Sequence, residues 1–222
     1  MAEHRYAILI ACNEYNYEEC SLPNLQFTRN DVDELRDILL SKKYGKFLNV
    51  KELINKNSYE IFQEIELILN KATNEDLVLI YFSGHGKLNM LGNLCLCTKN
   101  TKTKTLISTS IPIRHIKDHI EASKVTKIII ILDCCYSGLA CIEFGSLKGD
   151  LSGEIILLSE ARNRGIYVIT STTEYELSFE NILSKHGEFT KHLLEGIRSW
   201  KAVDKNENIT IQSLYSYIFK KC

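Results

Sequence analysis

The sequence contains a cysteine pair and a histidine that each follow a run of apolar residues. Residues 128–138 read "IIIILDCCYSG", so five apolar residues run directly into Asp133, Cys134 and Cys135. A second apolar run ends in "YFSGHGK", in which a glycine stands on either side of His85. A cysteine attacks carbonyl groups as its thiolate, and a neighbouring imidazole is a common base for forming that thiolate. These residue types therefore indicate nucleophilic catalysis by a cysteine.

The elements around these motifs alternate between strand and helix. Apolar runs bounded by turn residues predict strands at 5–12, 47–54, 76–84, 127–135 and 167–173. Apolar side chains spaced three and four apart predict helices at 30–45, 57–72, 111–123, 187–200 and 209–221. Such alternation folds into a mostly parallel sheet with helices on both faces. Because the carboxyl ends of parallel strands share one edge, we expect His85 and Cys135 to meet there.

Two longer segments interrupt the alternation. Residues 86–109 contain short alternating pieces, which predict a hairpin followed by a loop. Residues 137–164 are longer than an ordinary connection, and connections of that length are usually functional. Within this second segment we expect a helix over residues 153–161.

The composition argues against several other classes of protein. The 222 residues carry a formal net charge of −1, so nothing favours nucleic acid or a membrane as a partner. The longest apolar runs are too short to span a bilayer. Eight irregularly spaced cysteines and no secretory signal indicate reduced thiols and a cytoplasmic location. We expect a single domain over residues 1–222, whose end at "SYIFKKC" is compatible with trimming from a longer protein.

The two motifs together resemble those of the caspase-like cysteine peptidases. "YFSGHGK" followed by "ILDCCYSG" is closer to the metacaspase-type and bacterial branch than to animal caspases, which have Gln-Ala-Cys in place of Asp133-Cys134-Cys135. The similarity extends through "AILIACNEY", "LQFTRNDVDELRDIL", "VITSTTEYELSFE" and "GEFTKHLLEGI". The resemblance implies an α/β fold of the caspase-like type. This fold is a three-layer sandwich whose mostly parallel central sheet has about six strands.

The resemblance also implies roles for individual residues. His85 would be the general base and Cys135 the nucleophile. The backbone amides of Gly86 and Cys135 would donate to the oxyanion, and the glycines beside His85 let substrate backbone approach closely. Cys134 is expected to face the core, since successive side chains of a strand point to opposite sides.

Carboxylates are implied in the S1 pocket, which receives the residue before the scissile bond. By resemblance this pocket contains Asp31, Ser83 and Asp133, and two carboxylates in a partly desolvated slot would select lysine or arginine. Asp31 could instead cap the first helix, and Asp133 could cap the following turn. An inward-pointing Arg29 would favour an acidic substrate residue, as in caspases that cleave after aspartate.

The implied function is a cysteine endopeptidase that cleaves a protein or peptide substrate after Arg or Lys through a Cys-His dyad. Its long loop carries Lys148, Arg162 and Arg164, which are candidates for self-cleavage. The resemblance further implies a role in bacterial defence or programmed cell death, with a sensor or activator as partner. The alternative is a catalytically silent caspase-like scaffold or regulatory module. Pseudo-enzymes usually lose the histidine or the cysteine, and both are present here.

No cofactor or metal ion is expected. Many metacaspases are activated by calcium through acidic residues after the histidine motif, whereas residues 77–117 contain no Asp or Glu. We therefore expect no calcium requirement. Three pairs could supply zinc ligands but lack the C-x-x-C spacing of a structural site. These pairs are Cys95 with Cys97, Cys134 with Cys135, and His115 with His119.

Overall fold

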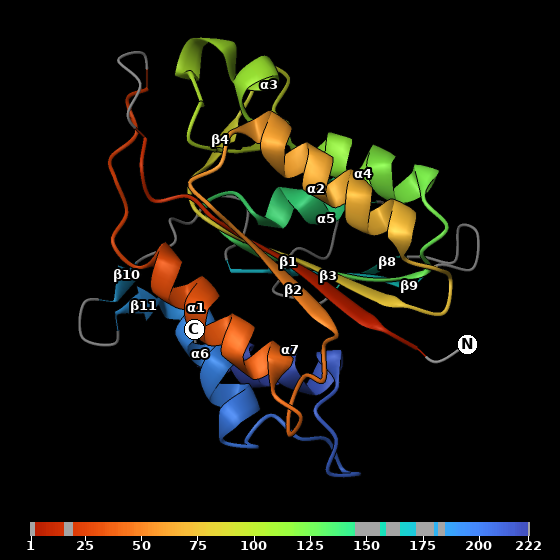
Figure 1. Ribbon diagram of the computed structural model, residues 1–222. Coiled ribbons are helices and arrows are strands. Elements are labelled where there is room, and N and C mark those ends of the chain that lie inside the picture. The colour runs from red at the N-terminus through yellow and green to blue at the C-terminus, as the bar shows by residue number, and fades with distance from the viewer. Residues whose placement is uncertain are drawn as a thin grey trace.

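A six-stranded sheet forms the centre of the molecule (Figure 1). The computed structural model describes residues 3–15, 20–144, 156–158, 165–171, 180–181 and 185–221. The strands of the central sheet are β1 Arg5–Ala11, β2 Asn49–Ile54, β3 Leu77–Ser83, β7 Lys127–Asp133, β8 Ile156–Leu158 and β9 Gly165–Thr170. Their order is β2-β1-β3-β7-β9-β8, and every neighbouring pair is parallel except the edge pair of β8 with β9.

The three central strands end at the same level. Ser83 of β3 pairs with Ala11 of β1 on one side and with Asp133 of β7 on the other. The residues that follow β3 and β7, which include His85 and Cys135, therefore leave the sheet at one edge. The strands are apolar along nearly their whole length, as expected for a parallel sheet buried on both faces.

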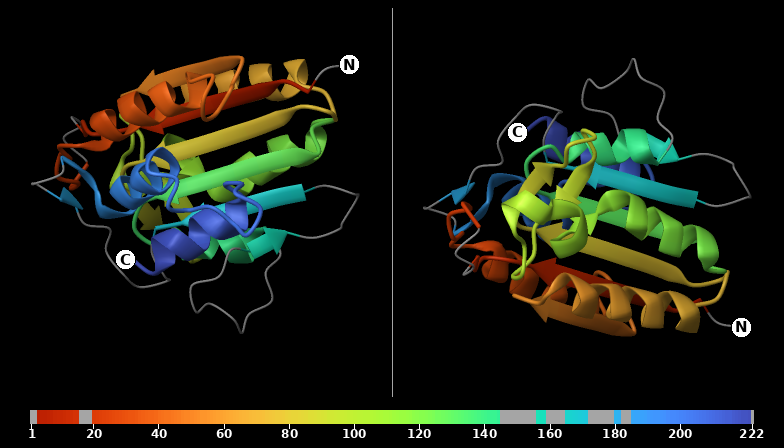
Figure 2. Two further views of the ribbon diagram at one scale, coloured as in Figure 1. Left: turned by 90° about the horizontal axis from the view of Figure 1, so that it is seen from below. Right: turned by 90° about the horizontal axis from the view of Figure 1, so that it is seen from above.

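Helices cover both faces of the sheet (Figures 1 and 2). Their bounds are α1 Thr28–Leu40, α2 Ser58–Lys71, α4 Ile113–Ala122, α5 Gly138–Glu143, α6 Glu188–Arg198 and α7 Ile211–Phe219. Ile8 and Ile10 of β1 pack in a core with α2, α4 and α5, while Ala7 and Leu9 pack in another with α1, α6 and α7. The predicted three-layer α/β sandwich is thus confirmed. Within the described ranges, no helix has the length and apolar character needed to cross a membrane.

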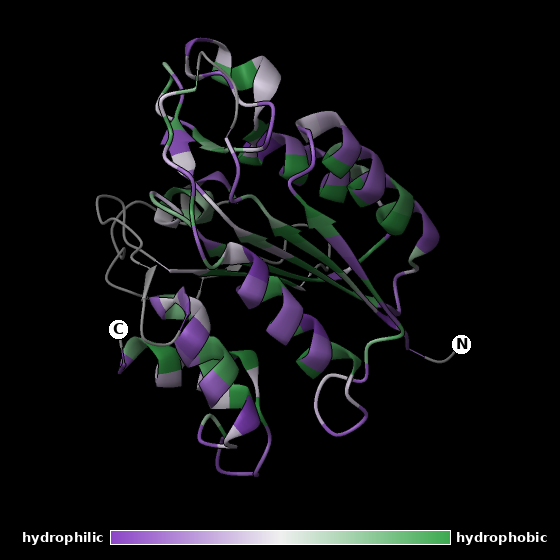
Figure 3. Ribbon diagram, turned by 60° about the vertical axis from the view of Figure 1, so that its left-hand side comes forward, coloured by the Kyte–Doolittle hydropathy of each residue, from purple (hydrophilic) through white to green (hydrophobic). Residues whose placement is uncertain are grey.

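Hydropathy follows the same layers (Figure 3). The central strands are almost entirely hydrophobic, whereas the helices are hydrophobic along one side and hydrophilic along the other. An apolar stripe on each helix is what holds it to the sheet, since burial of apolar surface is the main favourable term in folding.

Two small sheets stand at the carboxyl edge of the central sheet (Figure 1). One contains β4 Gly86–Leu88, β5 Leu94–Leu96 and β6 Ile111–Pro112, accompanied by the 3₁₀ helix η1 Thr103–Thr105 and by α3 Leu106–Thr109. The pairing of β4 with β5 confirms the hairpin predicted within residues 86–109, whereas the part expected as a loop contains η1 and α3. The other is a hairpin of β10 Glu180–Asn181 and β11 His186–Gly187, which leads directly into α6.

The helix expected over residues 153–161 is wrong, because Ile156–Leu158 form β8. A short apolar run has no periodicity that separates a strand from a buried helical turn. The open edge of β9 decides the outcome here, since it pairs with β8 in antiparallel register. Helix α5 was not expected from the sequence, and it begins three residues after Cys135.

Candidate active site

The segments that carry His85 and Cys135 come together where β3 and β7 leave the sheet. The Gly84 amide donates to the carbonyl oxygen of Asp133 at 3.3 Å, which extends the pairing beyond the two strands. A Cβ atom added to Gly86 would lie 2.1 Å from the carbonyl oxygen of Cys135. No side chain fits at that distance. Glycine after His85 is therefore required for the two motifs to approach each other.

The two adjacent cysteines have different environments. Cys134 is fully buried in the core beside α5, and this burial raises the pKa of its thiol well above the ordinary value. Cys135 is partly exposed. Tyr136 then adopts a left-handed backbone conformation with φ of 60°, which turns the chain toward α5. The predicted core position of Cys134 is confirmed, and Cys135 is the accessible thiol of the pair.

Contacts on both sides fix the orientation of His85. Its Nε2 lies 2.9 Å from the carbonyl oxygen of Pro23. Because a carbonyl oxygen only accepts, Nε2 carries the hydrogen, and the basic lone pair of the neutral ring is at Nδ1. The hydroxyl of Tyr15 accepts from the His85 backbone N–H at 3.0 Å, and the two rings pack 5.0 Å apart. The imidazole is thus held in one tautomer.

The Gly86 amide is not used by the neighbouring strand. The N–H of Cys97 donates to the carbonyl of His85 at 2.8 Å, which makes Gly86 and Leu96 a non-hydrogen-bonded pair of the β4–β5 ladder. The Gly86 N–H consequently does not point at β5. This geometry suits the oxyanion role expected for it alongside the amide of Cys135.

The expected S1 residues converge around Gly187 of β11. Ser83 Oγ donates to Asp31 Oδ2 at 3.2 Å, and the Gly187 N–H donates to Asp31 Oδ1 at 3.3 Å. A Cβ added to Gly187 would lie 2.6 Å from Asp133 Oδ2 and 3.5 Å from Asp31 Oδ2. The structure therefore brings together side chains from α1, β3 and β7 that are far apart in the sequence.

A chain of hydroxyl groups holds Asp133. Thr190 Oγ1 donates to Asp133 Oδ2 at 2.7 Å, and the Tyr81 hydroxyl lies 2.7 Å from Thr190 Oγ1. Since Thr190 uses its hydrogen on Asp133, Tyr81 is the donor in the second bond. Burial, together with repulsion from Asp31, raises the pKa of Asp133 to about 7, although hydrogen bonds from Thr190 and Ser171 oppose the rise. Two buried carboxyl groups at close quarters make this a place where a cation is favoured.

Two alternatives for this region can be compared with the geometry. Asp31 is only 1% exposed, and its carboxylate contacts Ser83 and Gly187 rather than capping α1. Arg29 is 65% exposed at its side chain, and its Nε lies 3.7 Å from Asp33 Oδ2. The Arg29 side chain is therefore turned to solvent along α1, and the inward orientation that would favour an acidic substrate residue is not observed.

Several side chains of the site gave no functional signal in the sequence. Tyr15 and Thr190 lie in segments that resemble the family, but their polar contacts depend on residues distant in the chain. Pro23 acts through its carbonyl group, which any residue possesses. His186, whose Nδ1 lies 2.8 Å from Asp31 Oδ1, stands beside the "GEFT" segment without being part of any recognisable pattern.

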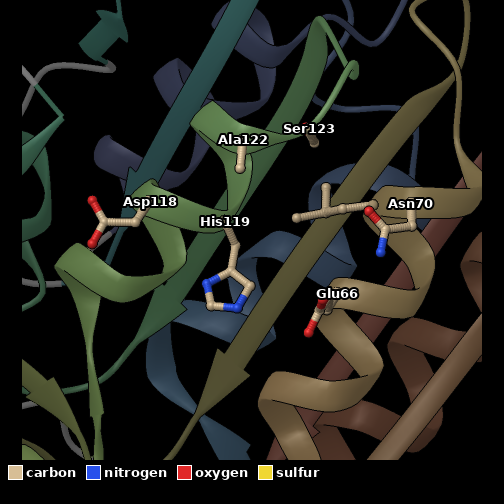
Figure 4. A pocket seen from close by; sticks show the side chains of 7 residues that line it. Glu66, Asn70, Asp118, His119, Ala122 and Ser123 are labelled. Carbon is tan, nitrogen blue, oxygen red and sulfur yellow. The ribbon is translucent and has the colours of Figure 1, made fainter.

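The residues considered for zinc do not form a metal site. In the part of the chain that the structure describes, no three His, Cys, Asp or Glu side chains are placed to hold a metal ion. His119 Nδ1 donates to the His115 carbonyl at 2.7 Å, and its ring stacks on Phe62 with centroids 5.4 Å apart. A hollow of about 310 Å³ lies beside His119, lined also by Glu66 and Asp118 (Figure 4). It lies between α2 and α4, away from Cys135.

Thiol labelling should distinguish the two adjacent cysteines. We expect iodoacetamide to alkylate Cys135 in the folded protein and to leave Cys134 unmodified, because only Cys135 is accessible. Mass spectrometry of the peptide that contains both residues provides the measurement. The label on this peptide should disappear in Cys135→Ala and persist in Cys134→Ala. Labelling that survives in Cys135→Ala would contradict the assignment.

The stability of the protein should fall with rising pH because of Asp133. The unfolded carboxyl group ionises near its ordinary pKa of 3.8, whereas the folded one retains its proton up to about pH 7. Relative to Asp133→Asn, the free energy of unfolding of the wild type should decline between these two pH values, by about 1.4 kcal/mol for each pH unit. Urea unfolding at pH 4, 5.5, 7 and 8 measures this difference. If the free energy of unfolding depends on pH in the same way in both proteins, Asp133 is not held in its neutral form.

Comparisons with known proteins agree with this architecture. Caspase-1 from Spodoptera frugiperda superimposes with a TM-score of 0.61 at 19% sequence identity, over 99% of this chain and 77% of that chain, which shows a shared fold. No curated protein matches the sequence. The model of the caspase domain family matches residues 4–218, which is nearly the whole chain. The chain therefore belongs to the caspase domain family of cysteine peptidases.

Proposed function

We propose that this protein is a cysteine endopeptidase that cleaves peptide bonds after arginine or lysine. The observation that carries the specificity is the convergence of two buried carboxyl groups, those of Asp31 and Asp133, around Gly187. The chemistry rests on the pairing of β3 with β7, which brings His85 and Cys135 to one edge. Membership of the caspase domain family supports a peptidase activity of the cysteine type.

The reaction would begin with transfer of the Cys135 thiol proton to Nδ1 of His85. The thiolate attacks the scissile carbonyl carbon, and the amides of Gly86 and Cys135 donate to the resulting oxyanion. As the tetrahedral intermediate collapses, His85 returns the proton to the leaving amine, and an acyl-enzyme remains. A water molecule, deprotonated by His85, then attacks the thioester. This step releases the acid product and the free thiol.

The Pro23 carbonyl contributes to both proton transfers. By accepting from Nε2 it keeps Nδ1 as the nitrogen that accepts the thiol proton. It also stabilises the imidazolium that forms, because both ring nitrogens then carry hydrogens and need acceptors.

A basic substrate side chain would complete the charge balance of the pocket. Asp31 and Asp133 repel each other when both are ionised, and this repulsion contributes to the raised pKa of Asp133. A guanidinium or ammonium group between them favours ionisation of both, and a planar guanidinium can form paired hydrogen bonds with a carboxylate. Ser83 would keep Asp31 oriented toward the substrate.

Peptides that differ only at the residue before the scissile bond test this function. For fluorogenic substrates with Arg, Lys, Asp or Leu at that position, we expect kcat/KM for Arg and Lys to exceed that for Asp and Leu by at least about a hundredfold. Cys135→Ala should abolish turnover, and Asp133→Asn should weaken the preference for basic residues.

Two results would contradict this function. Preferential cleavage after Asp would retain the Cys-His pair but overturn the pocket. If none of the peptides is cleaved and Cys135 does not react with electrophiles, the scaffold or regulatory alternative is favoured.

We further propose that the active protein cleaves its own chain in the segment between β7 and β9, which also contains α5 and β8. Its candidate sites, Lys148, Arg162 and Arg164, lie outside the described residues. Intact-mass analysis of the purified wild type should reveal two fragments whose boundary follows one of these residues. Cys135→Ala should remain a single chain. A wild type that turns over Arg peptides while its mass stays that of the intact chain would count against self-cleavage.

A further inference from the structure

His186 contacts the carboxylate of Asp31 and is only 8% exposed. Its Nδ1 is 2.8 Å from Asp31 Oδ1, and its Nε2 is 3.1 Å from Glu34 Oε1. Glu34 lies on the next turn of α1 after Asp31 and forms an ion pair with Arg198 of α6. One imidazole ring thus links a carboxylate of the proposed S1 pocket to an ion pair between two helices.

The geometry of these contacts favours a charged ring. Ionised carboxylates only accept hydrogen bonds, so both ring nitrogens of His186 donate when Asp31 and Glu34 are ionised. A neutral imidazole carries a single N–H and can satisfy only one of the two carboxylates. The hydrogen bond to Asp31 accordingly raises the pKa of His186, in opposition to its burial.

Among the described residues, His186 makes the shortest hydrogen bond to the Asp31 carboxylate. The other donors are the Ser83 hydroxyl at 3.2 Å and the Gly187 amide at 3.3 Å, and both are neutral. A hydrogen bond between charged groups is about twice as strong as one between neutral groups. The orientation of the Asp31 carboxylate therefore depends more on His186 than on either neutral donor.

The hairpin that carries His186 is itself fixed to α1. Asn30 Nδ2 donates to the carbonyl of Lys185 at 3.2 Å, one residue before His186. The Gly187 amide bonds to Asp31, one residue after it. Three consecutive residues of the hairpin therefore contact the first turns of α1, and these contacts hold the ring beside Asp31.

We propose that His186 is a positioning residue of the S1 pocket, which holds the Asp31 carboxylate in the orientation that receives a basic substrate side chain. The proposal rests on the proposed function, since it concerns the same pocket. A carboxylate that is oriented in advance loses less freedom when the substrate binds. The role of His186 is therefore in binding, and it takes no part in the proton transfers of His85.

Two substitutions separate this role from a general effect on folding. The side-chain amide nitrogen of His186→Asn falls close to the position of Nδ1 and can still donate to Asp31. In His186→Gln the amide nitrogen falls close to Nε2, so it can reach Glu34 but leaves Asp31 without this donor. His192→Gln is the matched control, since His192 is a buried histidine on α6 that contacts Glu188 at 3.1 Å but not Asp31.

Steady-state kinetics with an Arg peptide provide the test. We expect His186→Gln to raise KM about tenfold with kcat changed less than about threefold, because the missing bond acts on binding. His186→Asn should restore KM to within about threefold of the wild type, and His192→Gln should leave it unchanged. The rate of Cys135 alkylation should be equal in all four proteins, which shows that the catalytic edge is intact.

The possible outcomes are distinguishable. If the wild type cleaves Arg peptides and His186→Gln has the same KM, or if His186→Asn is as impaired as His186→Gln, the positioning role is wrong while the proposed function stands. If His186→Gln raises KM but also slows Cys135 alkylation and lowers kcat, His186 is a structural residue and the proposal is overturned. A wild type that cleaves no basic peptide would overturn the proposed function and this role with it.

Discussion

The parallel pairing of β3 with β7 is the constraint on which the site depends. Because Ser83 is opposite Asp133, the residues two positions further along each chain are His85 and Cys135. A shift of one residue in this register would turn every strand side chain to the opposite face and separate the two. The register of β3 with β7 therefore fixes the geometry of the site as well as the centre of the fold.

Electrostatics impose the second constraint. Burying two carboxyl groups near each other is unfavourable unless donors or a cation compensate. Thr190 and Ser171 compensate Asp133, while His186, Ser83 and Gly187 compensate Asp31. Three of these five partners, His186, Gly187 and Thr190, come from β11 and the first turn of α6. The pocket thus depends on contacts between segments that are distant in sequence.

Much of the fold follows from local patterns. The strands that carry the two motifs are long apolar runs, and the helices have clear apolar stripes, so both could be placed from the sequence. The short strand Ile156–Leu158 could not, because its conformation depends on the free edge of β9 rather than on its own residues. Cytoplasmic location, an activating partner and a role in defence or cell death stay predictions.

The residues of the site likewise fall into those that could be identified from the sequence and those that could not. His85 and Cys135 stand in motifs whose residue types predict their chemistry, and Gly86 directly follows His85. Tyr81 is the first residue of "YFSGHGK" but shows no role of its own in the sequence, and His186 belongs to no motif. They acquire a role only when the fold places Tyr81 against Thr190 and His186 against Asp31. Tertiary hydrogen bonds of this kind leave no periodic trace in a single sequence.

The most direct measurement is a crystal structure of the protein after reaction with a peptide acyloxymethyl ketone that carries arginine at the position before the reactive group. We predict a covalent bond from Cys135 Sγ to the inhibitor and a guanidinium group between the carboxylates of Asp31 and Asp133. His186 should keep its contact with Asp31 in this complex. An arginine side chain bound elsewhere, or an adduct on another cysteine, would contradict the account.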